Sequence, residues 1–220
     1  NSLLLQNFFP LKKEDKPSIG FVGHAQLGII KYLKEYFNHL KYLGKRKLNL
    51  LLADSQSFYP SSIVRAKYLS KLTLVKELNT NFILRENYRA GAENEINKKK
   101  TTQEFYDNIF NNAYTFCSRG AGNFSVRFYE TLAVGRIPIL LNTDCRLPLS
   151  HIIDWSKHCV IIETSISESL EMQILRFHNS KTEADFEALQ KSNRGLWKNH
   201  LLRHNYFIDI HNMFTKRKND

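Results

Sequence analysis

The 220-residue chain lacks several features that mark particular classes of protein. It has only three cysteines, Cys117, Cys145 and Cys159. So sparse and odd a set argues against a disulfide framework or a zinc site and favours reduced thiols in a cytoplasmic setting. No apolar run approaches the roughly 18 to 20 residues of a membrane-spanning helix. We therefore expect a cytoplasmic protein, whose contact with a membrane would be peripheral.

Acidic residues are also scarce, at 21 against 32 lysines and arginines, which gives a formal net charge of +11. An excess of this size suggests anionic partners such as sugar nucleotides, lipid diphosphates, an anionic membrane surface or nucleic acid. The basic clusters at 98–100 and 216–218 are interpreted as solvated segment ends, with membrane contact as the alternative. No helix-turn-helix, RNP or zinc-finger pattern is present, so specific nucleic-acid binding is the weaker hypothesis.

Short apolar runs alternate with segments of helical spacing along the chain. The expected strands are 18–22, 48–53, 82–84, 113–117, 137–141 and 158–163. The expected helices are 27–43, 62–78, 101–111, 124–134, 167–178 and 182–200. This alternation predicts an α/β fold, with a Rossmann-like, mostly parallel sheet and helices on both faces. Residues 1–15 are expected to be a linker and residues 202–220 a C-terminal tail.

The most informative stretch is SRGAGNFSVRFYETLAVGRIPILL, from 118 to 141, which predicts a glycine loop, a helix and a strand. Gly120 and Gly122 allow the backbone to turn sharply and to approach a ligand, and Asn123 or Ser125 can cap the helix. Unpaired N–H groups at a helix start favour a bound anion. The stretch therefore predicts a phosphate-binding site.

The predicted helix has two different faces. Its apolar stripe, which should pack on the sheet, is Phe124, Phe128 and Leu132. Arg127 and Glu130 lie on another face with Asn123, and Gly135 is placed to end the helix. A surface ion pair is the bland alternative for Arg127 and Glu130, since they are spaced i, i+3.

Further polar residues follow predicted strands, where open α/β sheets bind ligands. These weaker candidates are His24, Arg85, Arg89, Asn142, Thr143 and Asp144. Each has a structural alternative: a hydrogen-bonded loop histidine, a solvated basic edge, or a turn built by Asn and Asp.

The longer string SRGAGNFSVRFYETLAVGRIPILLNTDCRLP resembles the signature of exostosin-like glycosyltransferases, a family with the two-domain GT-B architecture. KPSIGFVGHA (16–25) and NFILRENYRAG (81–91) resemble two further strand-and-loop units of its donor-binding domain. The similarity covers residues 16–201. It implies that this chain corresponds to the C-terminal, nucleotide-sugar-binding half of a GT-B enzyme, and that the acceptor-binding domain is absent from it.

The resemblance also implies roles for individual residues. Glu130 would hydrogen-bond the ribose hydroxyls of a sugar nucleotide, preferably a UDP-sugar and next a GDP-sugar. Arg119 and the backbone of 120–125 would meet the diphosphate, while Arg127 would orient Glu130 or reach a phosphate. The acceptor would be a glycan or a lipid-linked molecule, and the general base would come from outside this chain.

The sequence contains no Asp-x-Asp pair of the kind that holds a divalent cation in glycosyltransferases of the other common architecture. We therefore expect a metal-independent enzyme without a cofactor. A non-catalytic module that binds a nucleotide or carbohydrate with the same fold is the alternative hypothesis.

Overall fold

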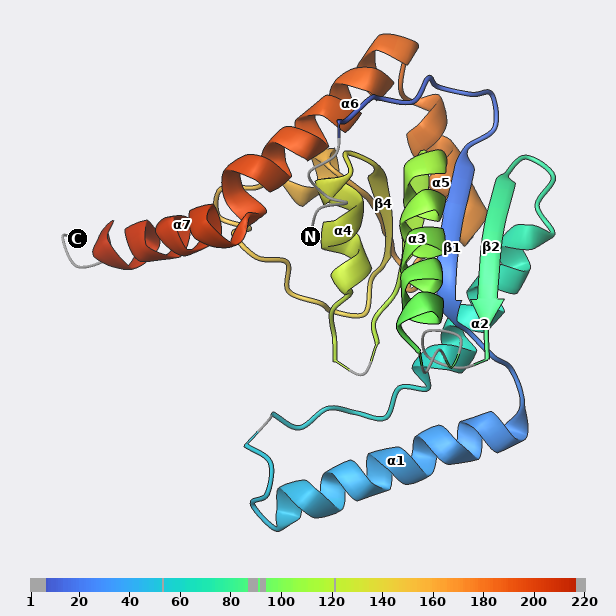
Figure 1. Ribbon diagram of the computed structural model, residues 1–220, viewed down its shortest axis with the longest axis vertical. Coiled ribbons are helices and arrows are strands. Elements are labelled where there is room, and N and C mark those ends of the chain that lie inside the picture. Colours follow the sequence, from blue (N-terminus) through green and yellow to red (C-terminus); the bar gives the residue numbers. More distant parts are fainter. Residues whose placement is uncertain (1–6, 53, 87–90, 92–93, 121, 217–220) are drawn as a thin grey trace.

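The structure, a computed structural model, describes residues 7–52, 54–86, 91, 94–120 and 122–216 (Figure 1). Five parallel strands form one sheet in the order β2-β1-β3-β4-β5. The strands are β1 (Ser18–His24), β2 (Asn79–Arg85), β3 (Tyr114–Cys117), β4 (Ile137–Leu141) and β5 (Val160–Ile162). The predicted α/β fold with a parallel sheet is confirmed.

Seven α-helices accompany the strands in the described residues. They are α1 (Ile29–Lys47), α2 (Ser61–Thr73), α3 (Glu95–Asn111), α4 (Val126–Ala133), α5 (Leu170–Asn179), α6 (Glu183–Leu196) and α7 (Arg203–Lys216). A short 3-10 helix, η3 (Trp155–Lys157), precedes β5, and a π-helical turn, η4 (Trp197–Leu201), joins α6 to α7. Among the described helices, none combines the length and the apolar character that crossing a bilayer requires.

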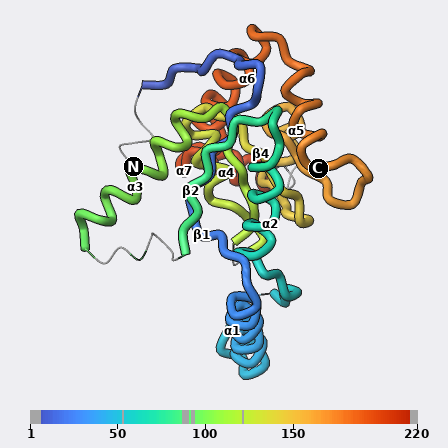
Figure 2. Tube along the Cα trace, turned by 90° about the vertical axis from the view of Figure 1, so that its right-hand side faces the viewer, coloured from blue at the N-terminus to red at the C-terminus, as the bar shows by residue number. Residues whose placement is uncertain are grey.

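The sheet lies between two helical layers, with α3 and α4 on one face and α2 and α5 on the other (Figures 1 and 2). The larger core cluster joins side chains of α2, α5 and α6 to the sheet, including Leu69, Ile174 and Phe186. The smaller cluster packs Phe128 and Leu132 of α4 against other apolar residues. All five residues of β4 are buried, as expected for a central parallel strand.

Local sequence signals explain several helix boundaries. Thr182 and Asp185 form a reciprocal capping box at the start of α6. Gly135 follows the end of α4 with a φ of 74°, a left-handed conformation that glycine adopts without strain, so its predicted role as a helix stop is confirmed. A Cβ at Gly20 would lie 2.5 Å from Asn108 Oδ1, which shows how closely α3 approaches β1.

Two expectations from the sequence are wrong. Residues 48–52 form no strand, and Leu52 is 98% exposed. The reason is that residues 79–85 occupy the edge position beside β1, so the apolar run has no strand to join. Phe124 is 58% exposed and precedes the helix, because α4 begins only at Val126.

The two ends of the described chain pack on the domain. The amide of Leu11 donates to Gln190 Oε1 over 2.9 Å, and Gln190 Nε2 donates back to the Leu11 carbonyl over 2.8 Å. The buried Arg136 donates to the carbonyls of Phe9 and Phe110. At the other end, part of the segment expected as a tail forms α7, which packs on η4.

The burial pattern predicts a contrast between two apolar truncations. Ile139→Ala, at a fully buried position of β4, should lower the free energy of unfolding by about 2 to 5 kcal/mol. Leu52→Ala should change it by less than about 0.5 kcal/mol, because the side chain is already in water. Urea denaturation of both variants measures these changes. A large loss of unfolding free energy in Leu52→Ala would instead support the strand expected from the sequence at 48–53.

Candidate functional site

The strands β1 and β3 are paired over only part of their length. β1 pairs with β2 from Ser18 to His24, whereas it pairs with β3 only at Ile19 and Gly20. Beyond Gly20 the ladder between them ends, and this is where the strand order of the sheet reverses. Open α/β sheets bind their ligands at such a reversal. The carbonyl groups of β1 that no longer face a strand need other hydrogen-bond donors.

Arg65 supplies donors to both strand ends. From α2, its Nη1 donates to the His24 carbonyl at the end of β1. Its Nε donates to Ser118 Oγ and its Nη2 to the Arg119 carbonyl, both over 2.9 Å, just after β3. Burial lowers the pKa of Arg65. The three bonds make Arg65 a cross-link between the two separated strands.

Arg127 fills the same opening from the first turn of α4. Its Nη2 donates to the Val22 carbonyl over 2.7 Å, and its guanidinium carbon lies 4.2 Å from the ring centroid of Phe21. Its Nε is buried without a partner. Burial, together with the nearby charges of Arg65 and Arg85, lowers the pKa of Arg127 to about 10. Arg127 is therefore a desolvated cation held by the end of β1 and not one half of a surface ion pair.

Arg119, the first candidate of the glycine loop, turns toward the segment that precedes α2. Its Nη2 donates to Gln56 Oε1 over 3.0 Å, and its guanidinium carbon lies 4.6 Å from the ring centroid of Tyr59. Arg119 Nε and the Tyr59 hydroxyl are both buried without a hydrogen-bond partner. Burial raises the pKa of Tyr59. Two polar groups of neighbouring side chains are thus buried with unused hydrogen-bonding capacity.

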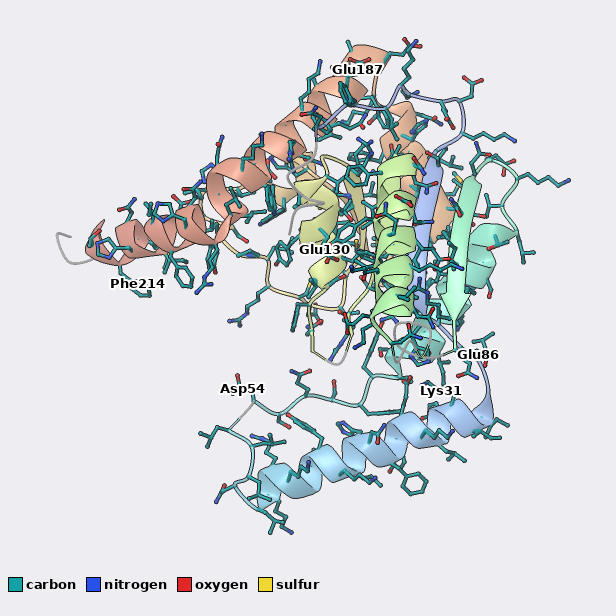
Figure 3. All side chains as sticks on the ribbon, viewed as in Figure 1. Lys31, Asp54, Glu86, Glu130, Glu187 and Phe214 are labelled. Atoms are coloured by element: carbon teal, nitrogen blue, oxygen red, sulfur yellow. The ribbon has the colours of Figure 1, made fainter. Side chains whose placement is uncertain are left out.

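Glu130 lies on α4 on the side of α3 (Figure 3). The Tyr106 hydroxyl donates to its Oε1 over a long 3.4 Å. Burial raises the pKa of Glu130, and the charge of Arg127 and the Tyr106 hydrogen bond offset this only in part. No ion pair between Arg127 and Glu130 is found in the described structure, so the carboxylate keeps free acceptor capacity.

Arg119 and Glu130 therefore do not touch each other. Glu130 interacts electrostatically with Arg127, Arg127 interacts with Arg65, and Arg65 binds the carbonyl of Arg119. The surface hollows lined by α7, by β2 and α3, and by β5 and α5 include neither residue. The site is marked by its charge and its unpartnered donors.

The loop between β3 and α4 is fixed by its own hydrogen bonds. The amide of Gly120 donates to the Phe124 carbonyl over 3.3 Å. Asn123 Nδ2 donates to the Thr143 carbonyl over 2.7 Å, and Thr143 Oγ1 donates to Asn123 Oδ1 over 2.6 Å. Ser125 occupies the N-cap position, but its side chain makes no capping bond. The expected side-chain cap is thus missing, because Asn123 is used to tie the loop to the end of β4.

Gly120 and Gly122 differ in their surroundings. A Cβ at Gly120 would meet no atom within 4 Å, whereas one at Gly122 would lie 2.7 Å from the exposed Phe124 ring. The protein itself therefore gives no steric reason for a glycine at position 120. Open space beside that backbone fits the predicted close approach of a ligand.

The candidates after β4 build a turn. The Asp144 amide donates to Asn142 Oδ1 over 3.1 Å, and Asp144 has a φ of 56°. Asn142 Nδ2 also donates to Glu163 Oε1 over 2.8 Å. These contacts match the structural alternative for Asn142, Thr143 and Asp144.

Two of the remaining candidates, His24 and Arg85, lie at the ends of β1 and β2. His24 Nε2 is 3.5 Å from Ser62 Oγ, and burial with the charges of Lys31 and Arg65 lowers the pKa of His24. Arg85 forms an ion pair with Glu104, so its charge is already matched. Arg89 lies outside the described residues.

Metal ligands do not gather in the described structure: no three His, Cys, Asp or Glu side chains lie together as a metal site would need. Metal independence remains a prediction. The cysteines are unpaired, and burial raises the pKa of Cys117 to about 12, which keeps it a thiol.

Sequence reasoning missed Gln56, Tyr59 and Arg65. A signal for Arg65 was present, because it is spaced i, i+3 from Ser62 and i, i+4 to Leu69, on the buried face of α2. A charged residue on such a face needs partners. Gln56 and Tyr59 lie in an irregular segment, where no periodicity points to a contact with Arg119.

Comparisons with known proteins match this chain to a family over a range that includes the candidate site. A family model described as Exostosin GT47 domain matches residues 34–176. Exostosin-1 of Bos taurus and of Mus musculus is 26% identical over 193 residues, covering 86% of this chain and 24% of the relative. Exostosin-like 1 of Homo sapiens is 33% identical over 85 residues, covering 38% of this chain and 12% of the relative. The chain thus spans about a quarter of the length of the curated Exostosin-1 relatives.

The cross-link by Arg65 predicts a large loss of stability on its removal. Arg65→Gln should lower the free energy of unfolding by about 2 to 4 kcal/mol, because it leaves the His24 and Arg119 carbonyls without donors. Arg176→Gln, which removes an arginine from an exposed ion pair with Glu168, should barely change it. Urea denaturation compares the two, and equal effects would mean that Arg65 does not hold the strands together.

Proposed function

The chain belongs to the exostosin GT47 family, and from this membership we propose that it is the donor-binding part of a glycosyltransferase. The proposed reaction moves a sugar from a nucleotide diphosphate, preferably a UDP-sugar, to a glycan or lipid-linked acceptor. The general base and the acceptor site are assigned to parts of the enzyme outside this chain. Binding of a nucleotide sugar is the step that the residues described above support.

The supporting observation is an unmatched positive charge at the sheet reversal. Arg65, Arg119 and Arg127 form no ion pair with any carboxylate in the part of the chain that the structure describes. Desolvated cations are costly unless an anion compensates them. A diphosphate at the ends of β1 and β3 would supply that anion.

Each residue has a role that its contacts permit. Arg119, with an unused Nε, is assigned to the diphosphate, where a guanidinium matches phosphate oxygens. The backbone at Gly120, whose amide already bonds the Phe124 carbonyl, is assigned to close packing against the same group. Glu130 is assigned to the ribose hydroxyls, since one carboxylate can accept both. Arg127, which already binds Val22, is assigned to orienting Glu130 rather than to a phosphate.

The same charges would assist the chemical step without a metal ion. Negative charge builds on the nucleotide diphosphate as it leaves the sugar. A positively charged group aimed at that leaving group stabilises the transition state, and losing one such contact typically slows a reaction by about a hundredfold or more. Arg119 is the residue we assign to this effect.

Nucleotide titration tests the proposal. By calorimetry the chain should bind UDP more tightly than GDP or CMP. Arg119→Gln should weaken UDP binding roughly tenfold to a hundredfold, because a charge-assisted hydrogen bond is lost. Gly120→Ala should weaken it without lowering the melting temperature, because the new methyl group meets no protein atom.

Gly44→Ala is the matched control for the loop variant. It makes the same change at a position in α1 that also has no atom within 4 Å of the new Cβ, and it should leave UDP binding unchanged. Absence of binding by all three nucleotides would refute the proposal for this chain. Normal binding by Gly120→Ala would remove the loop backbone from the site.

The raised pKa of Glu130 leads us to expect opposite pH trends for UDP binding and for stability. Its raised pKa means that the folded protein holds the proton more tightly than the unfolded chain does. Its contribution to stability is therefore full below the usual glutamate pKa of about 4.3 and is lost as the pH rises through the raised value. UDP affinity should instead rise with pH over the same window, because an ionised carboxylate accepts hydrogen bonds from the ribose.

Glu130→Gln separates these effects. It should remove the contribution of Glu130 to the pH dependence of stability and weaken UDP binding by roughly tenfold or more at neutral pH. Calorimetry and thermal melts across the acidic range measure both quantities. If wild type and variant show the same pH dependence of affinity, the titrating group belongs to the nucleotide phosphate and Glu130 has no role in binding.

A further inference from the structure

The helix α1 exposes an unusual amount of apolar surface. None of its 19 residues is buried, although it is rich in leucine, isoleucine and aromatic residues. Ile29 is 79% exposed, Ile30 72% and Phe37 58%. With Leu33 and Leu40 they follow i, i+3 and i, i+4 spacing and so form one stripe along the helix. A contiguous apolar surface of this kind marks an interaction site.

The orientation of this stripe is fixed by contacts on the other side of the helix. The rings of Tyr32 and Tyr36 lie 5.4 Å from the ring of Phe58, centroid to centroid. The Tyr42 hydroxyl donates to the Asp54 carbonyl, and Glu35 accepts a hydrogen bond from the Ser62 amide. On a helical projection Glu35 and Tyr42 lie roughly opposite Leu33 and Phe37, and the two tyrosines lie between these sides. The apolar stripe therefore faces away from the domain.

Positive charge borders the stripe. Lys34, Lys41 and Lys45 are exposed and lie along one edge of it, at i, i+7 and i, i+4 spacing. The sole acidic residue of the helix, Glu35, is on the attached side. Lysines beside an apolar stripe can bury their methylene stems and keep the ammonium groups at a charged surface. This is the residue pattern of helices that lie in a membrane interface.

The position of α1 suits such contact. It lies apart from the sheet, beyond the carboxyl ends of the strands, and the domain stands to one side of it (Figures 1 and 2). After the helix, Leu48, Leu50 and Leu52 extend the exposed apolar surface. A helix placed in this way can lie flat on a surface without moving the domain.

From these observations we propose that α1 is an interfacial helix that binds an anionic lipid bilayer through its apolar stripe and its flanking lysines. A bilayer can contact both the apolar stripe and the lysines, since its acyl chains pack against the stripe and its anionic headgroups bind the ammonium groups. The net charge of +11 attracts the whole chain to the same surface. Because α1 lies on the side of the carboxyl ends of the strands, docking would bring the candidate site toward the membrane. This position would suit a lipid-linked acceptor, an inference that rests on the proposed function.

Vesicle flotation tests the proposal. The chain should float with phosphatidylcholine vesicles that contain phosphatidylserine, weakly with phosphatidylcholine alone, and less as salt is raised. Leu33→Asn with Phe37→Asn should lower the partition coefficient roughly tenfold or more, because two apolar side chains are lost from the interface. Lys34→Glu with Lys41→Glu should lower it on the anionic vesicles.

The matched control for the charge variant of α1 makes the same change of charge in α3. Lys99→Glu with Lys100→Glu alters a basic cluster of α3 by the same charge and should reduce flotation far less than the α1 charge variant. An equal reduction would assign binding to net charge and overturn the role of α1, as would flotation that survives Leu33→Asn with Phe37→Asn. Light scattering that shows a dimer dissociated by that variant, without vesicle binding, would assign the stripe to a second copy. Nucleotide titration of the same variants should be unchanged, so this test is independent of the proposed function.

Discussion

The structure depends on the way two arginines satisfy the separated ends of β1 and β3. After Gly20 the two strands no longer pair, and the carbonyls of Val22 and His24 are bonded by Arg127 and Arg65. A neutral donor could satisfy one such carbonyl, but a guanidinium offers five N–H groups in a fixed fork and can join several. The domain thus keeps an opening at its strand reversal and fills it with positive charge.

This arrangement links stability to ligand binding. The arginines bridge the strands, yet their burial is unfavourable because neither forms an ion pair with a carboxylate in the described residues, and the more distant Glu35 and Glu130 offset the cost only in part. An anion bound at the same place would reduce that cost and stabilise the folded domain by mass action. Burial also links stability to binding at Glu130, where the buried group is an acid. It raises the pKa of Glu130 and so disfavours the ionised form that a hydroxyl ligand would require.

The sequence predicted the parts of this picture that local patterns control. The run at 137–141 and the glycine at 135 correctly indicated a buried strand and a helix end, since periodicity and backbone freedom are local properties. The strand expected at 48–53 failed because pairing is not local, and residues 79–85 hold the place beside β1. The contact of Arg119 with Gln56 and Tyr59 was unpredictable for the same reason, since it joins irregular segments about sixty residues apart.

The segment before α2 serves the candidate site and α1 together. Phe58 packs against the tyrosines that fix α1, while Gln56 and Tyr59, its near neighbours in sequence, contact the guanidinium of Arg119. Loops at the carboxyl ends of parallel strands accept long insertions without disturbing the sheet. Here the connection from β1 to β2 contains both α1 and α2. A displacement of α1 that moved this segment would therefore also remove the contacts that hold Arg119, so the environment of the diphosphate candidate depends on where α1 lies.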